Sequence, residues 1–162
     1  MKKYNILFLC THNSARSILG EALASTHPSN LFIGYSAGST PGTSINPIAE
    51  ELAVEMGYSK EKMYSKSWDV FSEPDAPQMD FIITVCDNAA NEPCPVWIGH
   101  PAIAHWGFPD PSKVEGSYID KKKAFITVMN GLKHKLDMFA SLPLEKLDRS
   151  SIQEELTKLE NL

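Results

Sequence analysis

The chain has 162 residues, of which 43% are hydrophobic and 22% are charged, and its formal net charge is −5. This is the composition of an ordinary globular protein, so we expect a single domain over residues 1–162. The negative charge argues against non-specific binding to nucleic acids or to anionic membranes. The apolar run after Lys2 and Lys3 is too short for a secretory signal, and no segment approaches the length of a membrane span. We therefore expect a cytoplasmic protein and take a monomer as the default.

Short apolar runs alternate with helical periodicities along the chain. Strands are predicted over residues 4–9, 31–38, 79–85 and 103–106. Helices are predicted from residue 17 to about 25, from the Asn46–Pro47 pair onward, and from about 117 to 139. Ser151 and Glu154 form a capping-box pattern, which predicts a last helix in a C-terminal helical extension over residues 141–162. Alternating strands and helices predict an α/β fold with a mostly parallel sheet.

The first predicted strand ends on Cys10, and Arg16 and Ser17 follow after five residues. In open α/β sheets, ligands bind beyond the carboxyl ends of the strands. A loop there can curl its backbone N–H groups around an anion, and the start of the next helix adds positive potential. Arg16 offers a planar fork for two oxygens of an oxyanion. The predicted oxyanion-binding residues are Thr11, His12, Asn13, Ser14, Ala15 and Arg16.

Such surroundings are expected to lower the pKa of Cys10, since they stabilise the thiolate that acts as the nucleophile. Ser17 is expected to donate a hydrogen bond to it. His12 is either an electrostatic influence on the thiol or a loop side chain that faces solvent, and we prefer the second interpretation.

Asp110 is the candidate general acid, because attack on an oxyanion expels an oxygen that needs a proton. It lies between Pro109 and Pro111, which restrict the backbone on both sides. The alternative is an ordinary turn aspartate before proline.

The chain has three cysteines, an odd number that argues against a structural disulfide framework. Cys86 and Cys94 follow another predicted strand, and in a parallel sheet that places them on the same side as Cys10. Three thiols at one edge of a sheet can form a disulfide relay. The alternatives are buried bystander thiols and a zinc site with His100 or His105, although no two cysteines have the Cys-x2-Cys spacing of such sites.

The stretch "FLCTHNSARS", with Asp110–Pro111 about a hundred residues later, resembles the low-molecular-weight protein tyrosine phosphatases. The resemblance implies a three-layer αβα fold with a four-stranded parallel sheet in the flavodoxin-like order 2-1-3-4. The stretches "TVCDNAANEPCP" and "HWGFPDPS" are similar to the arsenate reductases built on this fold, of the thioredoxin-coupled type. Ser112 and Lys113 follow the Asp–Pro pair where such phosphatases have aromatic residues, which disfavours phosphotyrosine as the substrate.

The second resemblance implies a mechanism. Arsenate, with phosphate or sulfate as a mimic, binds in the loop; Cys10 attacks arsenic, and Asp110 protonates the leaving oxygen. Cys86 then attacks Cys10 and releases arsenite, and Cys94 moves the disulfide to Cys86–Cys94. Thioredoxin is the implied reductant and no tightly bound cofactor is required. The Cys86–Cys94 interval is one residue longer than the Cys-x6-Cys interval of some relatives, so glutaredoxin with glutathione remains an alternative donor.

Two further alternatives stay open for the function of the loop. One is a phosphatase that hydrolyses phosphomonoesters through a Cys10 phosphoenzyme. The other is a non-catalytic module that binds an anion or a metal. The resemblance also implies a potassium ion near the loop, and four oxygen-bearing residues match its ligands, although they can equally be ordinary polar residues: Asn13, Glu21, Ser36 and Asp69.

Overall fold

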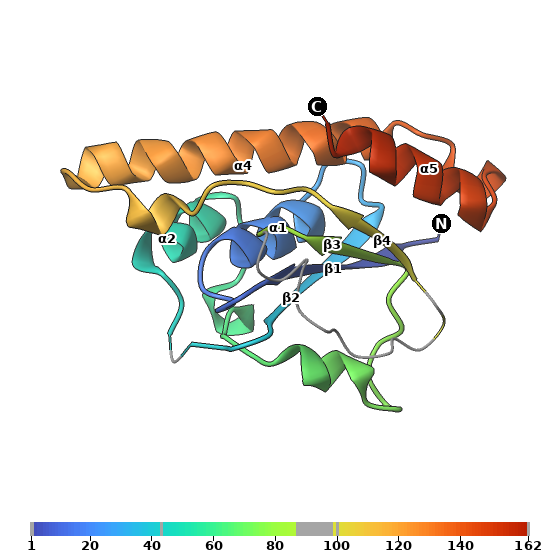
Figure 1. The fold of residues 1–162 in the computed structure, drawn as a ribbon, viewed down its shortest axis with the longest axis horizontal. Helices are drawn as coiled ribbons and strands as arrows, with labels where there is room; N and C mark the ends of the chain where they lie inside the picture. The colour runs from blue at the N-terminus through green and yellow to red at the C-terminus, as the bar shows by residue number, and fades with distance from the viewer. Residues whose placement is uncertain (1, 43, 87–98, 100, 162) are drawn as a thin grey trace.

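The fold is a four-stranded parallel sheet with helices packed against it (Figure 1). The computed structural model describes residues 2–42, 44–86, 99 and 101–161. The strands are β1 (Tyr4–Cys10), β2 (Phe32–Gly38), β3 (Phe81–Thr84) and β4 (Ala102–His105). They pair in the order β2-β1-β3-β4, and every pairing is parallel. The expected α/β class and the order 2-1-3-4 are confirmed.

The α-helices are α1 (Arg16–Ser25), α2 (Pro47–Glu55), α4 (Tyr118–Ala140) and α5 (Arg149–Leu159). The described residues also form four 3-10 segments: η1 (Lys60–Lys62), η2 (Trp68–Ser72), η3 (Pro111–Lys113) and η4 (Leu144–Lys146). In Figure 1, α1, α2 and α4 lie on one side of the sheet and η2 lies on the other. None of the helices in these described ranges has the length and apolar character needed to cross a membrane.

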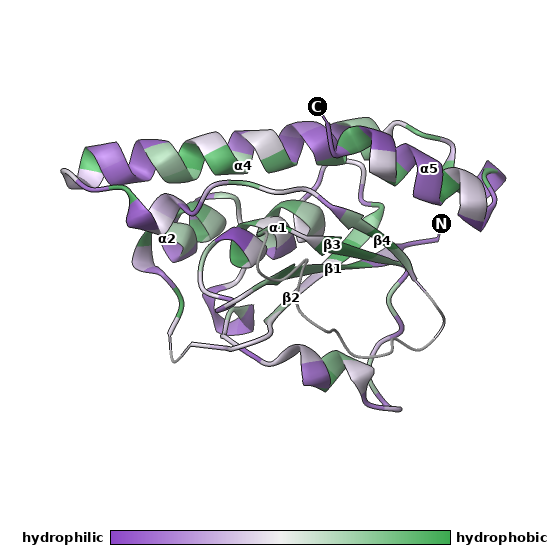
Figure 2. Cartoon of the chain, viewed as in Figure 1, coloured by the Kyte–Doolittle hydropathy of each residue, from purple (hydrophilic) through white to green (hydrophobic). Residues whose placement is uncertain are grey.

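The core lies on both faces of the sheet. Ile6, Leu7 and Phe8 of β1 are fully buried, as expected for a central strand covered on both sides. On the α4 side, the Phe139 ring packs edge-on against Phe81 of β3 with 4.9 Å between ring centroids. Figure 2 shows the strands as mainly hydrophobic, whereas α4 alternates between hydrophobic and hydrophilic residues. This burial holds the carboxyl ends of β1 and β3, and therefore Cys10 and the start of the following loops, in a fixed relation.

Two of the predicted helix starts agree with the structure and one is wrong. Asn46 caps α2 through its side chain, and α4 begins after Ser117 with a capping box. The last helix begins at Arg149, because the Asp148 carboxylate accepts a hydrogen bond from the Ser151 N–H at 2.7 Å. The expected capping box on Ser151 and Glu154 is therefore wrong, because Asp148 caps the helix three residues before Ser151.

The helix α5 covers the open edge of β4. The Gln153 side chain accepts a hydrogen bond from the Ile103 N–H at 2.9 Å and donates one to the Ile103 carbonyl at 2.7 Å. The Glu160 carboxylate accepts from the His105 N–H at 2.8 Å. The side chains of Gln153 in α5 and of Glu160 directly after it thus form hydrogen bonds with the backbone groups of β4 that a further strand would otherwise pair with.

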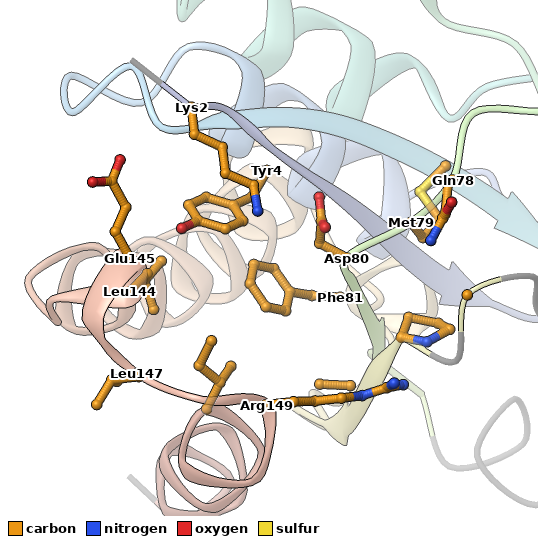
Figure 3. A pocket seen from close by; sticks show the side chains of 14 residues that line it. Lys2, Tyr4, Gln78, Met79, Asp80, Phe81, Leu144, Glu145, Leu147 and Arg149 are labelled. Carbon is orange, nitrogen blue, oxygen red and sulfur yellow. The ribbon is translucent and has the colours of Figure 1, made fainter.

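A pocket opens at the amino-terminal ends of the strands, at the opposite end of the sheet from Cys10. The rings of Tyr4 and Phe81 form part of its wall, and side chains of both charges surround it (Figure 3). Ligands of open α/β sheets bind at the carboxyl ends of the strands, so the candidate active site lies at the other end of the sheet, beside Cys10.

The helix α1 and the strand β2 approach each other closely at Gly34, so this contact can be tested. A Cβ atom added at Gly34 would lie 2.3 Å from the Glu21 carbonyl oxygen, which is rigid backbone. We expect Gly34→Ala to lower the free energy of unfolding by about 1–3 kcal/mol, the usual cost of overpacking, as measured by thermal unfolding. Gly42→Ala is the control, because its Cβ would meet its nearest atom at an ordinary 3.6 Å. A Gly34→Ala protein as stable as the wild type would show that α1 can shift away from β2 without cost.

Candidate active site

The loop after β1 is held with its carbonyl oxygens turned outward. Every carbonyl from Cys10 to Ser14 accepts a hydrogen bond from outside the loop. The donors are, in order, Ser39 N (3.3 Å), Thr40 N (2.8 Å), Gly42 N (2.9 Å), Ser65 Oγ (2.8 Å) and Asn46 N (2.9 Å). In a planar trans peptide the C=O and N–H groups point in opposite directions, so the N–H groups of residues 11–15 face the inside of the loop. The result is an anion-binding concavity at the end of β1.

Two local features complete this loop. Asn13 has a left-handed backbone with φ of 51°, which curls the chain. Helix α1 begins at Arg16 directly after Ala15, whose side chain makes no cap, so its first-turn N–H groups remain available to an anion.

Four of these five donors come from residues 39–46, the segment that follows β2, and the sequence did not predict this contact. This segment can approach because β2 ends in a glycine: a Cβ atom at Gly38 would lie 2.5 Å from the Thr11 carbonyl oxygen and 2.9 Å from the Asn13 nitrogen. A glycine that ends one predicted strand beside another strand's loop is the signal that could have revealed this contact.

Cys10 and Ser17 lie together inside the loop, with 2.9 Å between Cys10 Sγ and Ser17 Oγ, and both side chains are buried. Burial raises the pKa of the Cys10 thiol, whereas hydrogen bonds from Ser17 lower it; the nearby Cys86 raises it further, and a hydrogen bond from the Asn13 backbone lowers it. The net direction is upward. The expected lowering of this pKa is therefore wrong for the free site, because the desolvation of the enclosed sulfur outweighs its hydrogen bonds.

Arg16 and Asp110 face each other at the mouth of the loop. One guanidinium nitrogen donates to the Phe108 carbonyl at 2.8 Å, and another lies 3.8 Å from the Asp110 carboxylate. The other Asp110 oxygen accepts from the Ser112 N–H at 2.9 Å and from Ser112 Oγ at 2.6 Å. Burial raises the pKa of Asp110, but the Ser112 hydrogen bonds and the charges of Arg16 and Lys113 outweigh it and hold this pKa below its ordinary value. The carboxyl group of the free site is thus ionised at neutral pH.

Cys86 lies beside the same loop. Its Sγ is 3.5 Å from Thr11 Oγ1, it is buried, and both it and Cys10 are free thiols. The position follows from the sheet, since β3 pairs with β1 in parallel and both thiols stand at the carboxyl ends of these strands. Cys94 and His100, which also figure in the sequence predictions, lie outside the described residues. Across the part of the chain that the structure describes, no three His, Cys, Asp or Glu side chains gather in a way that could hold a metal ion.

The residues matched to potassium ligands separate into two groups. Ser36 Oγ donates to Glu21 Oε1 at 2.5 Å, and the backbone N–H and side-chain ammonium of Lys66 connect Asn13 to this pair. Asp69 is exposed on η2 and, within the described ranges, has no hydrogen bond or ion pair to the other three. Sequence reasoning missed Lys66, because only the fold brings it next to Asn13.

His12 points away from the loop interior. Its side chain is exposed, and Nδ1 lies 3.0 Å from the Thr40 carbonyl oxygen. This agrees with the preferred interpretation of a loop side chain that faces solvent; its contribution to the loop is its backbone.

The hydrogen bond between Ser17 and Cys10 yields a direct test in a Cys86→Ser, Cys94→Ser background, where Cys10 is the only thiol. Ser17→Ala removes the largest influence that lowers the pKa of Cys10. We expect the pKa to rise and alkylation by iodoacetamide near neutral pH to slow about tenfold, the effect of losing one hydrogen bond to a charged group. Ser141→Ala, at the exposed residue that follows α4, is the matched control. An unchanged pH profile of alkylation would show that Ser17 does not stabilise the Cys10 thiolate through a hydrogen bond.

Comparisons with known proteins agree with this geometry. Residues 5–155 match the family described as low molecular weight phosphotyrosine protein phosphatase. An arsenate reductase of Bacillus licheniformis is 34% identical over 140 residues, which cover 86% of this chain and 97% of the relative. A structure of an arsenate reductase in the oxidised state, 21% identical, aligns with a TM-score of 0.63 over 85% of this chain and 96% of the other. A thioredoxin-dependent arsenate reductase of Corynebacterium glutamicum, 20% identical, aligns with a TM-score of 0.58 over 85% of this chain and 62% of the other. This chain belongs to the low molecular weight phosphotyrosine protein phosphatase family.

Proposed function

We propose that this protein reduces arsenate to arsenite, with Cys10 as the nucleophile and Cys86 as the second thiol. The observation that carries the proposal is the buried free thiol of Cys86, 3.5 Å from Thr11 Oγ1 and so directly beside the oxyanion loop. Hydrolysis of a phosphate ester needs no second thiol, whereas reduction needs a pair of thiols to supply two electrons. The B. licheniformis relative, which is named an arsenate reductase, supports the same activity.

Substrate binding follows from the geometry of the loop. The inward N–H groups, the start of α1 and the Arg16 guanidinium all favour a tetrahedral dianion. Its negative charge opposes ionisation of Asp110 and draws Arg16 away from it, and both effects raise the pKa of Asp110. The carboxyl group can then hold the proton that the leaving oxygen requires.

The first step forms a bond between Cys10 Sγ and arsenic, and the thiol proton passes to an oxygen of the bound oxyanion as the sulfur attacks. One arsenic–oxygen bond breaks, and the departing hydroxide takes the Asp110 proton and leaves as water. The Ser17 hydroxyl, 2.9 Å from the sulfur, stabilises the thiolate that attacks. Arsenic remains in its pentavalent state through this step.

The second step transfers the electrons. The Cys86 thiolate attacks Cys10 Sγ, a disulfide forms, and the electron pair of the broken sulfur–arsenic bond stays on arsenic, which leaves as trivalent arsenite. Cys94 then attacks Cys86 and frees the Cys10 thiolate. A dithiol protein reduces the Cys86–Cys94 disulfide; we propose thioredoxin, in keeping with the printed name of the C. glutamicum neighbour, with glutaredoxin and glutathione as the alternative.

Phosphomonoester hydrolysis is the second candidate function. It is favoured by Cys10, Arg16 and Asp110, which together are sufficient for a Cys10 phosphoenzyme and for protonation of the leaving alcohol. Phosphate and arsenate are nearly isosteric, so the loop alone does not separate the two reactions. The second and third thiols do, because they matter only for reduction.

The role of Asp110 can be tested by Asp110→Asn. We expect the first step, followed by single-turnover consumption of arsenate, to slow by roughly 10²–10⁴-fold, the usual contribution of a positioned acid. Phosphate binding, measured by calorimetry, should remain within a few-fold of wild type, because the substitution leaves Arg16 and the loop N–H groups in place. Asp75→Asn, at an exposed position, is the matched control. An unchanged first step would assign the acid to another group.

The relay is tested by substituting each thiol. Cys10→Ser should abolish arsenite production and any phosphatase activity. Cys86→Ser should abolish arsenite production but retain phosphatase activity with an aryl phosphate. Cys94→Ser should give a single turnover and then a Cys10–Cys86 disulfide, detected by mass spectrometry of the digested protein.

Three outcomes would contradict these assignments. Multiple turnovers of Cys94→Ser at the wild-type rate with thioredoxin and its reductase would exclude the three-thiol relay. Arsenite production by Cys86→Ser at the wild-type rate would exclude Cys86 as the second thiol, and phosphatase activity alone in the wild type would select the alternative function.

A further inference from the structure

Lys66 is a buried lysine, which is unusual because an ammonium group loses its hydration on burial. Its side chain is 8% exposed. Nζ donates to the Ser36 carbonyl at 3.0 Å and to the Tyr64 carbonyl at 2.8 Å, and it lies 3.9 Å from Glu21 Oε1. The ammonium group thus has two hydrogen-bond acceptors and one ion-pair partner, and all three of these atoms are oxygens.

The partner carboxyl group, that of Glu21, is also buried. Glu21 is 4% exposed, and its two oxygens accept from the hydroxyls of Ser36 and Tyr58. Burial raises the pKa of Tyr58 and the adjacent Glu21 raises it further, so the phenol keeps its proton and donates it. The ammonium group of Lys66, 3.9 Å from Glu21 Oε1, places a positive charge beside this buried group and so offsets the cost of burying a carboxylate.

This buried pair is connected to the oxyanion loop. The Lys66 N–H donates to Asn13 Oδ1 at 2.9 Å, and Asn13 Nδ2 donates to Ser17 Oγ at 2.8 Å. Ser17 in turn lies 2.9 Å from Cys10 Sγ. The residue before Lys66, Ser65, donates to the Asn13 carbonyl at 2.8 Å. The position of Lys66 therefore sets the conformation of Asn13, the left-handed residue on which the curl of the loop depends.

We propose that Lys66 is a positioning residue whose ammonium group is a tethered monovalent cation, and that it replaces the potassium ion implied by the oxygen atoms of Asn13, Glu21 and Ser36. These oxygen atoms cannot bind potassium while Lys66 is in place, because Lys66 Nζ already lies between Glu21 Oε1 and the Ser36 carbonyl. A potassium ion there would add a second positive charge against the first. The proposal for Lys66 holds whether the protein reduces arsenate or hydrolyses phosphomonoesters, because both reactions require an oxyanion bound in the loop.

The test uses two measurements on the reduced protein: the midpoint of thermal unfolding and the affinity for inorganic phosphate by calorimetry. Both are made in choline, sodium, potassium and ammonium chloride at one ionic strength. The wild type should give the same values in all four salts. Lys66→Ala should unfold about 5 °C or more below wild type in choline and bind phosphate several-fold more weakly, since it leaves a buried carboxylate unpaired. Potassium or ammonium, but not choline, should recover much of both losses, because the truncated side chain leaves room for the ion.

Two further variants separate a cation effect from simple loss of packing. Lys66→Met keeps the size of the side chain without its charge, so it should lose phosphate affinity and show no recovery in potassium. Lys133→Ala, an exposed lysine of α4, should resemble wild type in every salt.

Three results would overturn the proposal: a wild type that gains stability or phosphate affinity in potassium, a Lys66→Met protein with wild-type phosphate affinity, or a Lys66→Ala protein with wild-type phosphate affinity in choline. If Lys66→Ala does not fold, the wild-type salt series and Lys66→Met still decide the question. Because phosphate binding requires no turnover, failure of the proposed arsenate reduction would leave this test intact.

Discussion

The active site depends on the outward direction of five consecutive carbonyl groups. Each carbonyl from Cys10 to Ser14 has a donor outside the loop, and together these donors hold the N–H groups toward the space where an anion binds. If one of these donors were lost, the peptide could rotate and direct a carbonyl oxygen at the anion, turning an attraction into a repulsion. The donors come from residues 39–46 and from Ser65, so the parallel pairing of β1 with β2 and the close approach at Gly38 are part of the anion site. The fold therefore presents backbone N–H groups to the anion, and Arg16 adds a positive charge at the mouth of the loop.

The free site holds Cys10 and Asp110, the two groups proposed to react, in the protonation states opposite to those that the proposed first step needs. Burial keeps Cys10 as a thiol, and Ser112 together with Arg16 keeps Asp110 as a carboxylate. A bound dianion raises the pKa of Asp110, because it engages the same guanidinium group. Its charge also opposes a thiolate at Cys10, so in the proposed first step the thiol proton passes to the bound oxyanion. One consequence is that Cys10 is a weak nucleophile toward peroxide or alkylating agents while no oxyanion is bound, which protects a thiol that must stay reduced. The substrate itself thus contributes to the activation of the site.

The sequence predicts those features that depend on neighbours along the chain. The strand that ends on Cys10, the helix that begins near Arg16 and the Asn46 cap are all local patterns, and the structure agrees with them. The parallel sheet then explains why Cys86 lies beside Thr11. By contrast, the contacts of Ser65 and Lys66 with Asn13 join residues more than fifty positions apart, and no local pattern predicts them. The pKa of Cys10 was predicted in the wrong direction for a related reason: hydrogen bonds can be expected from a motif, but the depth of burial depends on how the whole chain packs.

The helix α5 adds a consequence beyond the active site. Gln153 forms two hydrogen bonds with the backbone of Ile103, as a neighbouring peptide group would, and Glu160 occupies the N–H of His105. An edge strand with free N–H and carbonyl groups is a template on which a second polypeptide can add as a new strand. In this protein the Gln153 amide pairs with the backbone of Ile103 in place of a further strand, so the sheet does not extend beyond β4. Side chains of α5 and of Glu160, and not another strand, therefore protect this edge of the sheet from pairing with a second polypeptide.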